Sequence, residues 1–219
     1  MLDKKYFSLK HFNIEDLRNM PSRYRAHLIN SCTGYKSANL LGSKSNTGNS
    51  NLAIFNSVIH IGSTPPMLGF ILRPLTVKRN TYSNFKETGF FTVNQVNKDI
   101  IEDAHHTSAS YEVDISEFSK TNLTESYLDN FLAPYVKESA IKLGCSYVNE
   151  YEIKENGCLL IIGAIEHIYL PDNILKEDGW LQLDKTSGIA VNGLDAYALP
   201  ALLGRFGYAK PNEPTKTIL

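Results

Sequence analysis

The order of the apolar runs along this chain constrains its fold more than any other feature. Most runs are short enough to be strands, and they follow one another with only turns between many of them. The predicted helices interrupt this series rather than alternate with it, as they would in a parallel, doubly wound sheet. We therefore expect a mainly β fold, an antiparallel barrel with peripheral helices packed outside it.

Turn and breaker residues set the limits of the predicted elements. Pro and Gly residues interrupt the strand-like runs, and polar clusters such as SKSNTGNS separate them. The expected strands cover residues 27–35, 37–42, 51–61, 67–72, 90–96, 146–154 and 158–170. The expected helices cover residues 14–20, 81–88, 97–108 and 129–143. Since no flexible linker divides the chain, we expect an N-terminal arm with a short helix over residues 1–22 and a single domain over residues 23–219.

Composition and charge argue against several kinds of protein. The formal net charge of −1 lacks the basic excess of a nucleic-acid binder. No run approaches the roughly 18 apolar residues of a membrane span. The N-terminus also lacks the apolar core of a signal peptide, so we expect a cytoplasmic protein. The three cysteines form no CxxC pair and the histidines no HxH or HxxxH spacing, so no metal site is expected.

The segment RPLTVKRNTYSNFKETGFFTVN, residues 73–94, predicts an anion-binding helix start. Lys78 and Arg79 precede Thr81, whose hydroxyl can cap the following helix, and Gly89 can end that helix. Helix N-termini present unpaired backbone N–H groups and a partial positive charge, which suit a phosphate. The segment therefore predicts a phosphate grip between two strands.

Sequence motifs of other nucleotide-binding and hydrolytic folds are missing. No GxGxxG follows a predicted strand, and neither GxxxxGK[ST] nor GxSxG occurs in the sequence. These absences argue against a Rossmann domain, a P-loop enzyme and an α/β-hydrolase. The sequence also has no evident catalytic triad or carboxylate pair.

Four segments in order resemble the flavin reductase-like family of FMN-binding split barrels: NLAIFNSV, STPPMLGFIL, KRNTYSNFKETGFFTVN and SASYEVDISEF. The resemblance covers roughly residues 23–170. It implies a split β-barrel that binds FMN non-covalently at a homodimer interface. It also implies reduction of free or bound flavin by NADH or NADPH.

The resemblance assigns the FMN contacts residue by residue. Arg79 and Thr81 would grip the phosphate, together with the N–H groups of the helix. The isoalloxazine and ribityl chain would be lined by residues of one strand-like run: Asn51, Ala53, Phe55 and Asn56.

Two further contacts and two departures complete the comparison with the family. Arg73 would lie near the phosphate or the ribityl hydroxyls, and Asn94 would help shape the floor of the site. Ile54 stands where the family often has Pro, and Asn56 stands where Ser is common. These changes lie on the flavin face, so they leave the electron donor and acceptor open.

Each predicted contact also has a purely structural alternative. Arg79 can be a solvated cation at a helix start, and Thr81 can be a cap and nothing more. Arg73 before Pro can simply end a strand. Asn51 and Asn56 lie in an apolar run, where turn or cross-strand hydrogen bonds would satisfy their amides as well as a flavin would.

Aromatic and histidine residues have similar alternatives. Phe55 can be a core residue rather than a flavin contact. His105 and His106 are adjacent, so on a helix they cannot readily chelate one ion, although one of them could border the active site. The segment 197–208 is most simply core or dimer packing, with an aromatic that could also cover the flavin.

The first functional hypothesis is an FMN-dependent NAD(P)H:flavin oxidoreductase. Hydride transfer from the nicotinamide to flavin N5 requires no side-chain acid or nucleophile, so no catalytic residue is assigned. The second hypothesis is an FMN-containing electron carrier that a partner protein reduces. The third is a non-redox flavin-binding module.

Overall fold

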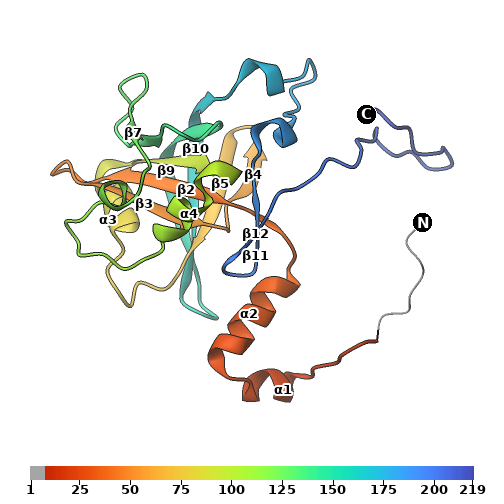
Figure 1. Cartoon of the computed structure of the whole chain (residues 1–219), viewed down its shortest axis with the longest axis horizontal. Coiled ribbons are helices and arrows are strands. Elements are labelled where there is room, and N and C mark those ends of the chain that lie inside the picture. Colours follow the sequence, from red (N-terminus) through yellow and green to blue (C-terminus); the bar gives the residue numbers. More distant parts are fainter. Residues whose placement is uncertain (1–7) are drawn as a thin grey trace.

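The computed structural model describes residues 8–219 and contains a seven-stranded antiparallel sheet (Figure 1). The strand order is β3-β2-β6-β9-β10-β5-β4. Their bounds are β2 (Asn39–Lys44), β3 (Ser50–Phe55), β4 (Ile59–Ser63), β5 (Pro66–Leu72), β6 (Phe90–Gln95), β9 (Lys142–Ile153) and β10 (Cys158–Tyr169). Among the described residues the edge strands β3 and β4 do not pair with each other, so the barrel stays split. The predicted mainly β, antiparallel architecture is confirmed.

Shorter elements surround this sheet. A three-stranded sheet has the order β1-β11-β12, and β7 pairs with β8. These strands are β1 (Lys36–Ser37), β7 (Glu125–Ser126), β8 (Tyr135–Val136), β11 (Ala190–Asn192) and β12 (Ala196–Ala198). The helices are α1 (Ile14–Asn19), α2 (Ser22–Cys32), α3 (Asn80–Thr88) and α4 (Ile101–His106). Four 3-10 turns cover η1 (Lys98–Ile100), η2 (Glu117–Lys120), η3 (Asp172–Ile174) and η4 (Leu183–Thr186).

The core lies on both faces of the sheet, because adjacent residues of a strand point to opposite sides. Leu40 of β2 packs in one apolar cluster with Leu52 and Val96. Its neighbour Leu41 packs in a second cluster, which contains Phe70 and the α3 residue Phe85. The Phe70 and Phe85 rings meet edge to face at 6.2 Å between centroids. This contact holds α3 against the barrel, which positions the beginning of that helix.

Most predicted elements are found close to their expected places. The short helix near residue 14, the helix before Gly89 and the strand before Asn97 correspond to α1, α3 and β6. Gly89 ends α3 with a φ of 81°, a left-handed conformation that favours glycine. The expected run over residues 51–61 is divided between β3 and β4, and the helix expected over residues 97–108 is realised as η1 and α4. Of the arm expected over residues 1–22, residues 1–7 lie outside the described part.

Two element predictions are wrong. Of the strand expected over residues 27–35, residues 27–32 are instead the second half of α2 and residues 33–35 follow its end, because a short apolar run fits a half-buried helix as well as a strand. The helix expected over residues 129–143 is an extended segment that leads through β8 into β9. Asp129 and Asn130 have positive φ angles of 49° and 57°, and Pro134 cannot continue a helix.

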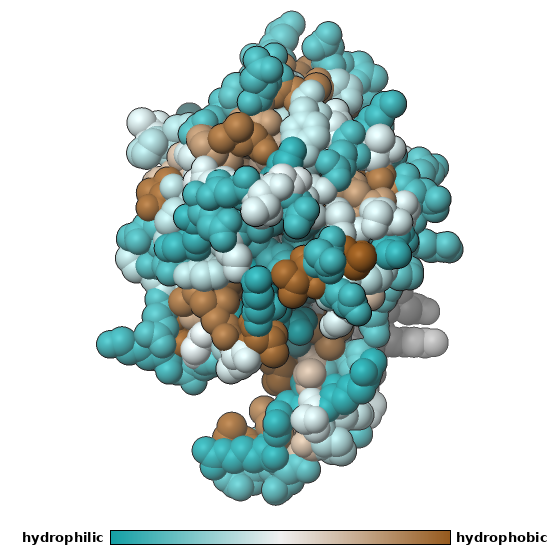
Figure 2. All heavy atoms as spheres, turned by 90° about the vertical axis from the view of Figure 1, so that its left-hand side faces the viewer, coloured by the Kyte–Doolittle hydropathy of each residue, from teal (hydrophilic) through white to brown (hydrophobic). Residues whose placement is uncertain are grey.

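No helix within residues 8–219 is long and apolar enough to cross a membrane. Helices α1 and α2 extend away from the barrel at the bottom of Figure 1, and the C-terminal tail extends to the right. Figure 2 shows these helices from another side as a lobe below the main body.

Candidate functional site

A cavity of about 830 Å³ lies beside β3 and the beginning of α3. Its size falls in the range of roughly 300–1,000 Å³ that is typical of small-molecule and cofactor sites. The wall comes from β3, the end of β5, the start of α3, the loop after α4 and the β11–β12 hairpin. The predicted site residues in this wall are Asn51, Ala53, Phe55, Asn56, Arg73, Arg79 and Thr81.

The wall at the start of α3 has the geometry of an anion site. Arg79 occupies the N-cap position, with no side-chain cap hydrogen bond, and the first amides of the helix have no intrahelical acceptor. Thr81 is buried, and its Oγ1 accepts a hydrogen bond of 2.9 Å from Nδ2 of Asn51. The Thr81 hydroxyl hydrogen therefore remains available to a ligand. We call this part of the cavity, formed by Asn51, Arg79 and Thr81, the α3 end.

The charge at the α3 end is positive. Arg73, Lys78 and Arg79 line the cavity, and none of them forms an ion pair with a residue in the range 8–219. Nε of Arg79 is buried and has no hydrogen-bond partner among the described residues. A buried donor without a partner is costly, so an anionic ligand would satisfy it.

Glu117 is a carboxyl group in the same wall. Its Oε2 accepts a hydrogen bond of 2.8 Å from the backbone N–H of Leu52. Burial raises the pKa of the Glu117 carboxyl, and this effect outweighs the backbone hydrogen bonds that lower it. Burial therefore disfavours the ionised Glu117 carboxylate, whose negative charge would partly cancel the positive charge of the basic residues in this wall.

Strand β3 leads away from the α3 end. Asn51 and Phe55 are four residues apart, which corresponds to about 13 Å along a strand. Phe55 is half-buried, and its ring packs edge to face on Phe70 at 5.3 Å between centroids. The next residue, Asn56, donates a hydrogen bond of 3.2 Å from Nδ2 to the carbonyl oxygen of Gly193. Phe55 is therefore both a core contact and part of the cavity wall.

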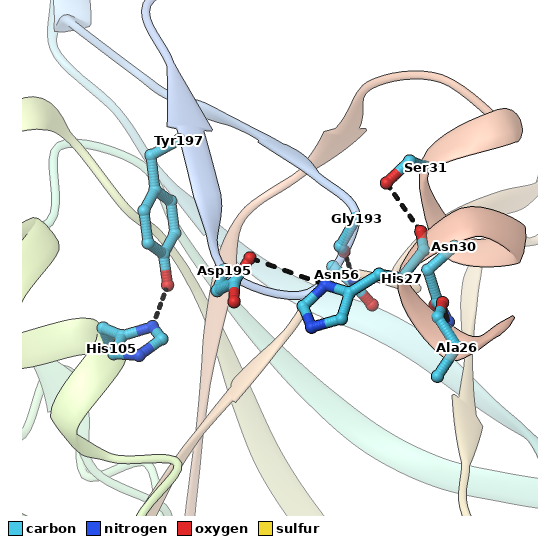
Figure 3. A network of polar contacts seen from close by, with 9 residues as sticks. All are labelled: Ala26, His27, Asn30, Ser31, Asn56, His105, Gly193, Asp195 and Tyr197. Atoms are coloured by element: carbon cyan, nitrogen blue, oxygen red, sulfur yellow. Dashed lines mark hydrogen bonds and ion pairs between the residues drawn. The ribbon is translucent and has the colours of Figure 1, made fainter. Parts of the chain in front are cut away.

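The β11–β12 hairpin lines the cavity, and Figure 3 shows its polar contacts with α2 and α4. In its turn, Asp195 Oδ1 lies 4.0 Å from Nδ1 of His27 on α2. On its second strand, Tyr197 places its hydroxyl 2.7 Å from Nδ1 of His105 on α4. We call this part of the cavity, formed by Phe55, Asn56, His105, Leu194 and Tyr197, the hairpin end.

The loop after α4 and the turn of the hairpin were not predicted to belong to the site, whereas Tyr197 was named as core or dimer packing or as an aromatic that could cover the flavin, and it lines the cavity. The loop supplies the polar run Thr107–Tyr111, and its hydroxyl-rich sequence TSASY is a signal that could have been used. The turn carries Asn192-Gly193, a dipeptide typical of hairpins. The prediction that one of the two histidines could border the site fits His105, which lines the cavity.

Asn94 lies in the core rather than in the cavity wall. Its Nδ2 donates to the carbonyl oxygen of Leu40 at 3.1 Å and to Oγ1 of Thr92 at 2.9 Å. Its Oδ1 accepts from the backbone N–H of Val136 at 3.0 Å. These bonds tie β6 to β2 and β8, so in this structure Asn94 stabilises the sheet instead of shaping the floor of the site.

Comparisons with known proteins agree with this fold. Residues 36–189 match the family model of the flavin reductase like domain. The crystal structure of a candidate flavin reductase with a split barrel domain from Shewanella frigidimarina NCIMB 400 is 44% identical, with a TM-score of 0.88. That alignment covers 91% of this chain and 100% of that chain.

Two more distant proteins extend the comparison. An FMN-binding protein from Thermus thermophilus, solved with bound 1-cyclohex-2-enone, is 13% identical, with a TM-score of 0.63. The match covers 76% of this chain and 87% of that chain, and at this identity it shows the fold alone. A protein of Methanothermobacter thermautotrophicus is 29% identical over 112 residues. That match spans 50% of this chain and about half, 53%, of the relative.

Proposed function

Because this chain belongs to the flavin reductase like family, we propose that it binds FMN non-covalently and transfers hydride to flavin from NADH or NADPH. The observation that supports FMN most directly is the α3 end of the cavity. There a buried Arg79 Nε without a partner among the described residues lies in the same wall as a free helix N-terminus and the Thr81 hydroxyl. Such a set of donors suits a terminal phosphate.

In this proposal the cavity residues bind and orient the cofactor. Arg79, Thr81 and the first amides of α3 hold the phosphate, and Arg73 adds positive charge beside it. Strand β3 then guides the ribityl chain toward the hairpin end, where Phe55 and Asn56 border the ring system. The length of β3 between Asn51 and Phe55, about 13 Å, separates a phosphate site from a ring site.

The bound FMN would supply the hydride acceptor of the reaction. The residues of the chain would then hold the isoalloxazine ring in place, leave room for the nicotinamide and limit the access of water. No acid, base or nucleophile is needed for the hydride step itself. This division of tasks agrees with a wall in which apolar side chains are mixed with hydroxyl, amide and basic groups.

The test is the visible absorbance spectrum of the purified protein, recorded with added FMN before and after anaerobic addition of NADH or NADPH. We expect bound oxidised flavin, which one of the two nucleotides bleaches at a catalytically useful rate. Bleaching only by dithionite or a reduced partner protein would contradict the reductase proposal and favour an electron carrier. Failure to bind FMN at all would contradict every flavin function.

We also propose that the protein is a homodimer. No residue of α1 or α2 is buried within the described part of the chain. The C-terminal tail likewise exposes large apolar side chains, such as Leu203, which is 97% exposed, and Tyr208, which is 96% exposed. Large apolar side chains that are left open by one chain are typical of an association surface. Light scattering should give about 49 kDa, twice the chain mass of 24.5 kDa, and a mass of 24.5 kDa would contradict the dimer.

A further inference from the structure

The hairpin end of the cavity contains a donor pair that the proposed hydride transfer leaves unused. His105 and Tyr197 come from different elements, α4 and β12, and are 92 positions apart in the sequence. Their rings meet at 90° with 5.8 Å between centroids, and the Tyr197 hydroxyl lies 2.7 Å from Nδ1 of His105. Both side chains line the cavity. Figure 3 shows how they point toward each other.

The hydrogen bond fixes which nitrogen of His105 can serve a ligand. Burial raises the pKa of the Tyr197 phenol, and the nearby Asp195 carboxylate raises it further, so the phenol keeps its proton at neutral pH. Since Nδ1 is occupied by the Tyr197 hydroxyl, Nε2 is the ring nitrogen of His105 left for a ligand. In the tautomer taken for the proposal below, the phenol donates to Nδ1 and the ring hydrogen is on Nε2, so that His105 is a donor through Nε2 and Tyr197 orients it.

The position of His105 in the cavity indicates which part of a bound FMN would lie beside it. FMN carries its phosphate and its isoalloxazine at opposite ends of the ribityl chain. With the phosphate at the α3 end, the ring system lies toward the hairpin end. The isoalloxazine has one polar edge, formed by the nitrogen and carbonyl groups of its pyrimidine ring, and one apolar edge that carries methyl groups. A donor such as Nε2–H can pair only with the polar edge.

We propose that His105, oriented by Tyr197, donates a hydrogen bond to the polar edge of the isoalloxazine and thereby stabilises the reduced flavin more than the oxidised flavin. This inference rests on the proposed function. A flavin that accepted a hydride, that is two electrons and one proton, would carry more negative charge at this edge than an oxidised one. A donor to that edge gains strength when its acceptor becomes charged.

The neighbouring histidine provides a matched control. His106 is on the same helix, and its Nδ1 lies 2.6 Å from the hydroxyl of Tyr111, in a pair of the same chemistry. The two rings of that pair are stacked, with an interplanar angle of 12°. His106 is absent from the wall of the cavity, whereas His105 is part of it. Of the two histidines, only His105 can therefore contact the flavin directly, whereas His106 reaches the wall only through its partner Tyr111.

The experiment is an anaerobic titration with a reference dye, which gives the midpoint potential of bound FMN in each variant. We expect His105→Phe to weaken the binding of reduced FMN about tenfold more than that of oxidised FMN, a shift of about −30 mV for two electrons. His105→Gln, which keeps an N–H donor, should recover most of this loss. Tyr197→Phe should show an intermediate loss, because the ring stays while the orienting hydroxyl is removed. His106→Phe should leave the potential unchanged.

Equal potentials in His105→Phe and His106→Phe would overturn the inference, as would a change only in the KM for the nicotinamide nucleotide. The second result would assign His105 to the other substrate. Failure of the unmodified protein to bind FMN would overturn the proposed function as well. Binding of FMN with equal potentials in the two variants would overturn only the inference about His105. A loss in His105→Phe that His105→Gln fails to recover would show a packing effect and would also contradict the proposed donor role.

Discussion

Arg79 combines a local structural position with an unsatisfied side chain. Its backbone precedes the first turn of α3, where it accepts the first helical hydrogen bond from the N–H of Ser83 at 3.0 Å. Its Nε is buried without a partner among the described residues. A structural arginine at a helix start would normally place its guanidinium in water or against a carboxylate. The observed burial therefore favours the phosphate role over the alternative of a solvated cation.

Replacement of Arg79 by Ala should weaken FMN binding. A charge-assisted hydrogen bond contributes roughly 1.5–3 kcal/mol, which corresponds to about a 10- to 150-fold higher Kd. The Kd of Arg79→Lys should lie between those of the unmodified protein and Arg79→Ala, because lysine keeps the positive charge but lacks the planar guanidinium group. Quenching of FMN fluorescence measures the Kd directly. The control is Arg18→Ala, which removes an exposed arginine of α1 that pairs only with Glu15 among the described residues. An unchanged Kd in Arg79→Ala would place the phosphate elsewhere.

At the scale of elements, the contact between β10 and β6 depends on a missing side chain. A Cβ atom at Gly163 of β10 would lie 2.5 Å and 2.9 Å from two ring carbons of Phe91 in β6. Such distances are far inside van der Waals contact. Phe91 is fully buried and packs against Phe70 at 5.5 Å between centroids, so its ring has little room to move.

We therefore expect Gly163→Ala to destabilise the protein by about 1–3 kcal/mol, as overpacked cores commonly do. For a chain of this size, each kcal/mol corresponds to about 2–4 °C in Tm. The matched control is Gly62→Ala in β4, where the nearest atom to an added Cβ is at 3.4 Å, an ordinary contact. Thermal unfolding followed by circular dichroism compares the two variants. Equal Tm values for Gly163→Ala and Gly62→Ala would contradict this prediction and show that the Phe91 ring can move aside at little cost.

The elements also show where sequence reasoning succeeds and where it stops. Helix α3 was predictable because its start and end carry local signals, Thr81 and Gly89, that act within a few residues. The segment 129–143 was not, although Pro134 stands within it. Its apolar content suggested a helix, whereas Pro134 argued against a continuous one.

The same limit applies to the candidate site. Asn51 and Thr81 could be assigned from a family resemblance, and the structure brings them together in a hydrogen bond that joins β3 to α3. His105 and Tyr197 could not be paired from the sequence, because their contact depends on how the β11–β12 hairpin returns to the barrel. Asn94 was assigned to the site although its amide satisfies the backbone of two neighbouring strands. Local pattern cannot distinguish a buried asparagine that serves the sheet from one that serves a ligand.

At the scale of the whole molecule, the barrel and the C-terminal tail are separate in their packing. The tail after Leu199 contributes no side chain to the core within residues 8–219. One attachment comes from Arg205, whose guanidinium pairs with Asp178 and lies 4.7 Å from the centroid of the Trp180 ring. The tail leaves large apolar side chains such as Leu203 and Tyr208 almost fully exposed. In the homodimer proposed above, we place this tail at the contact between the two copies of the chain.

Deletion of residues 200–219 should leave the barrel folded and convert the dimer to a monomer. The deletion removes no residue of the core clusters. At protein concentrations where both proteins are monomeric, the Tm of the shortened chain should therefore stay within about 4 °C of that of the full chain, a change of roughly 1 kcal/mol. The mass by light scattering should fall to that of one shortened chain. Arg205→Ala provides a milder test, because it releases the tail from Trp180 without removing its apolar side chains. A truncated protein that stays dimeric would assign the interface to the barrel or to α1 and α2 instead.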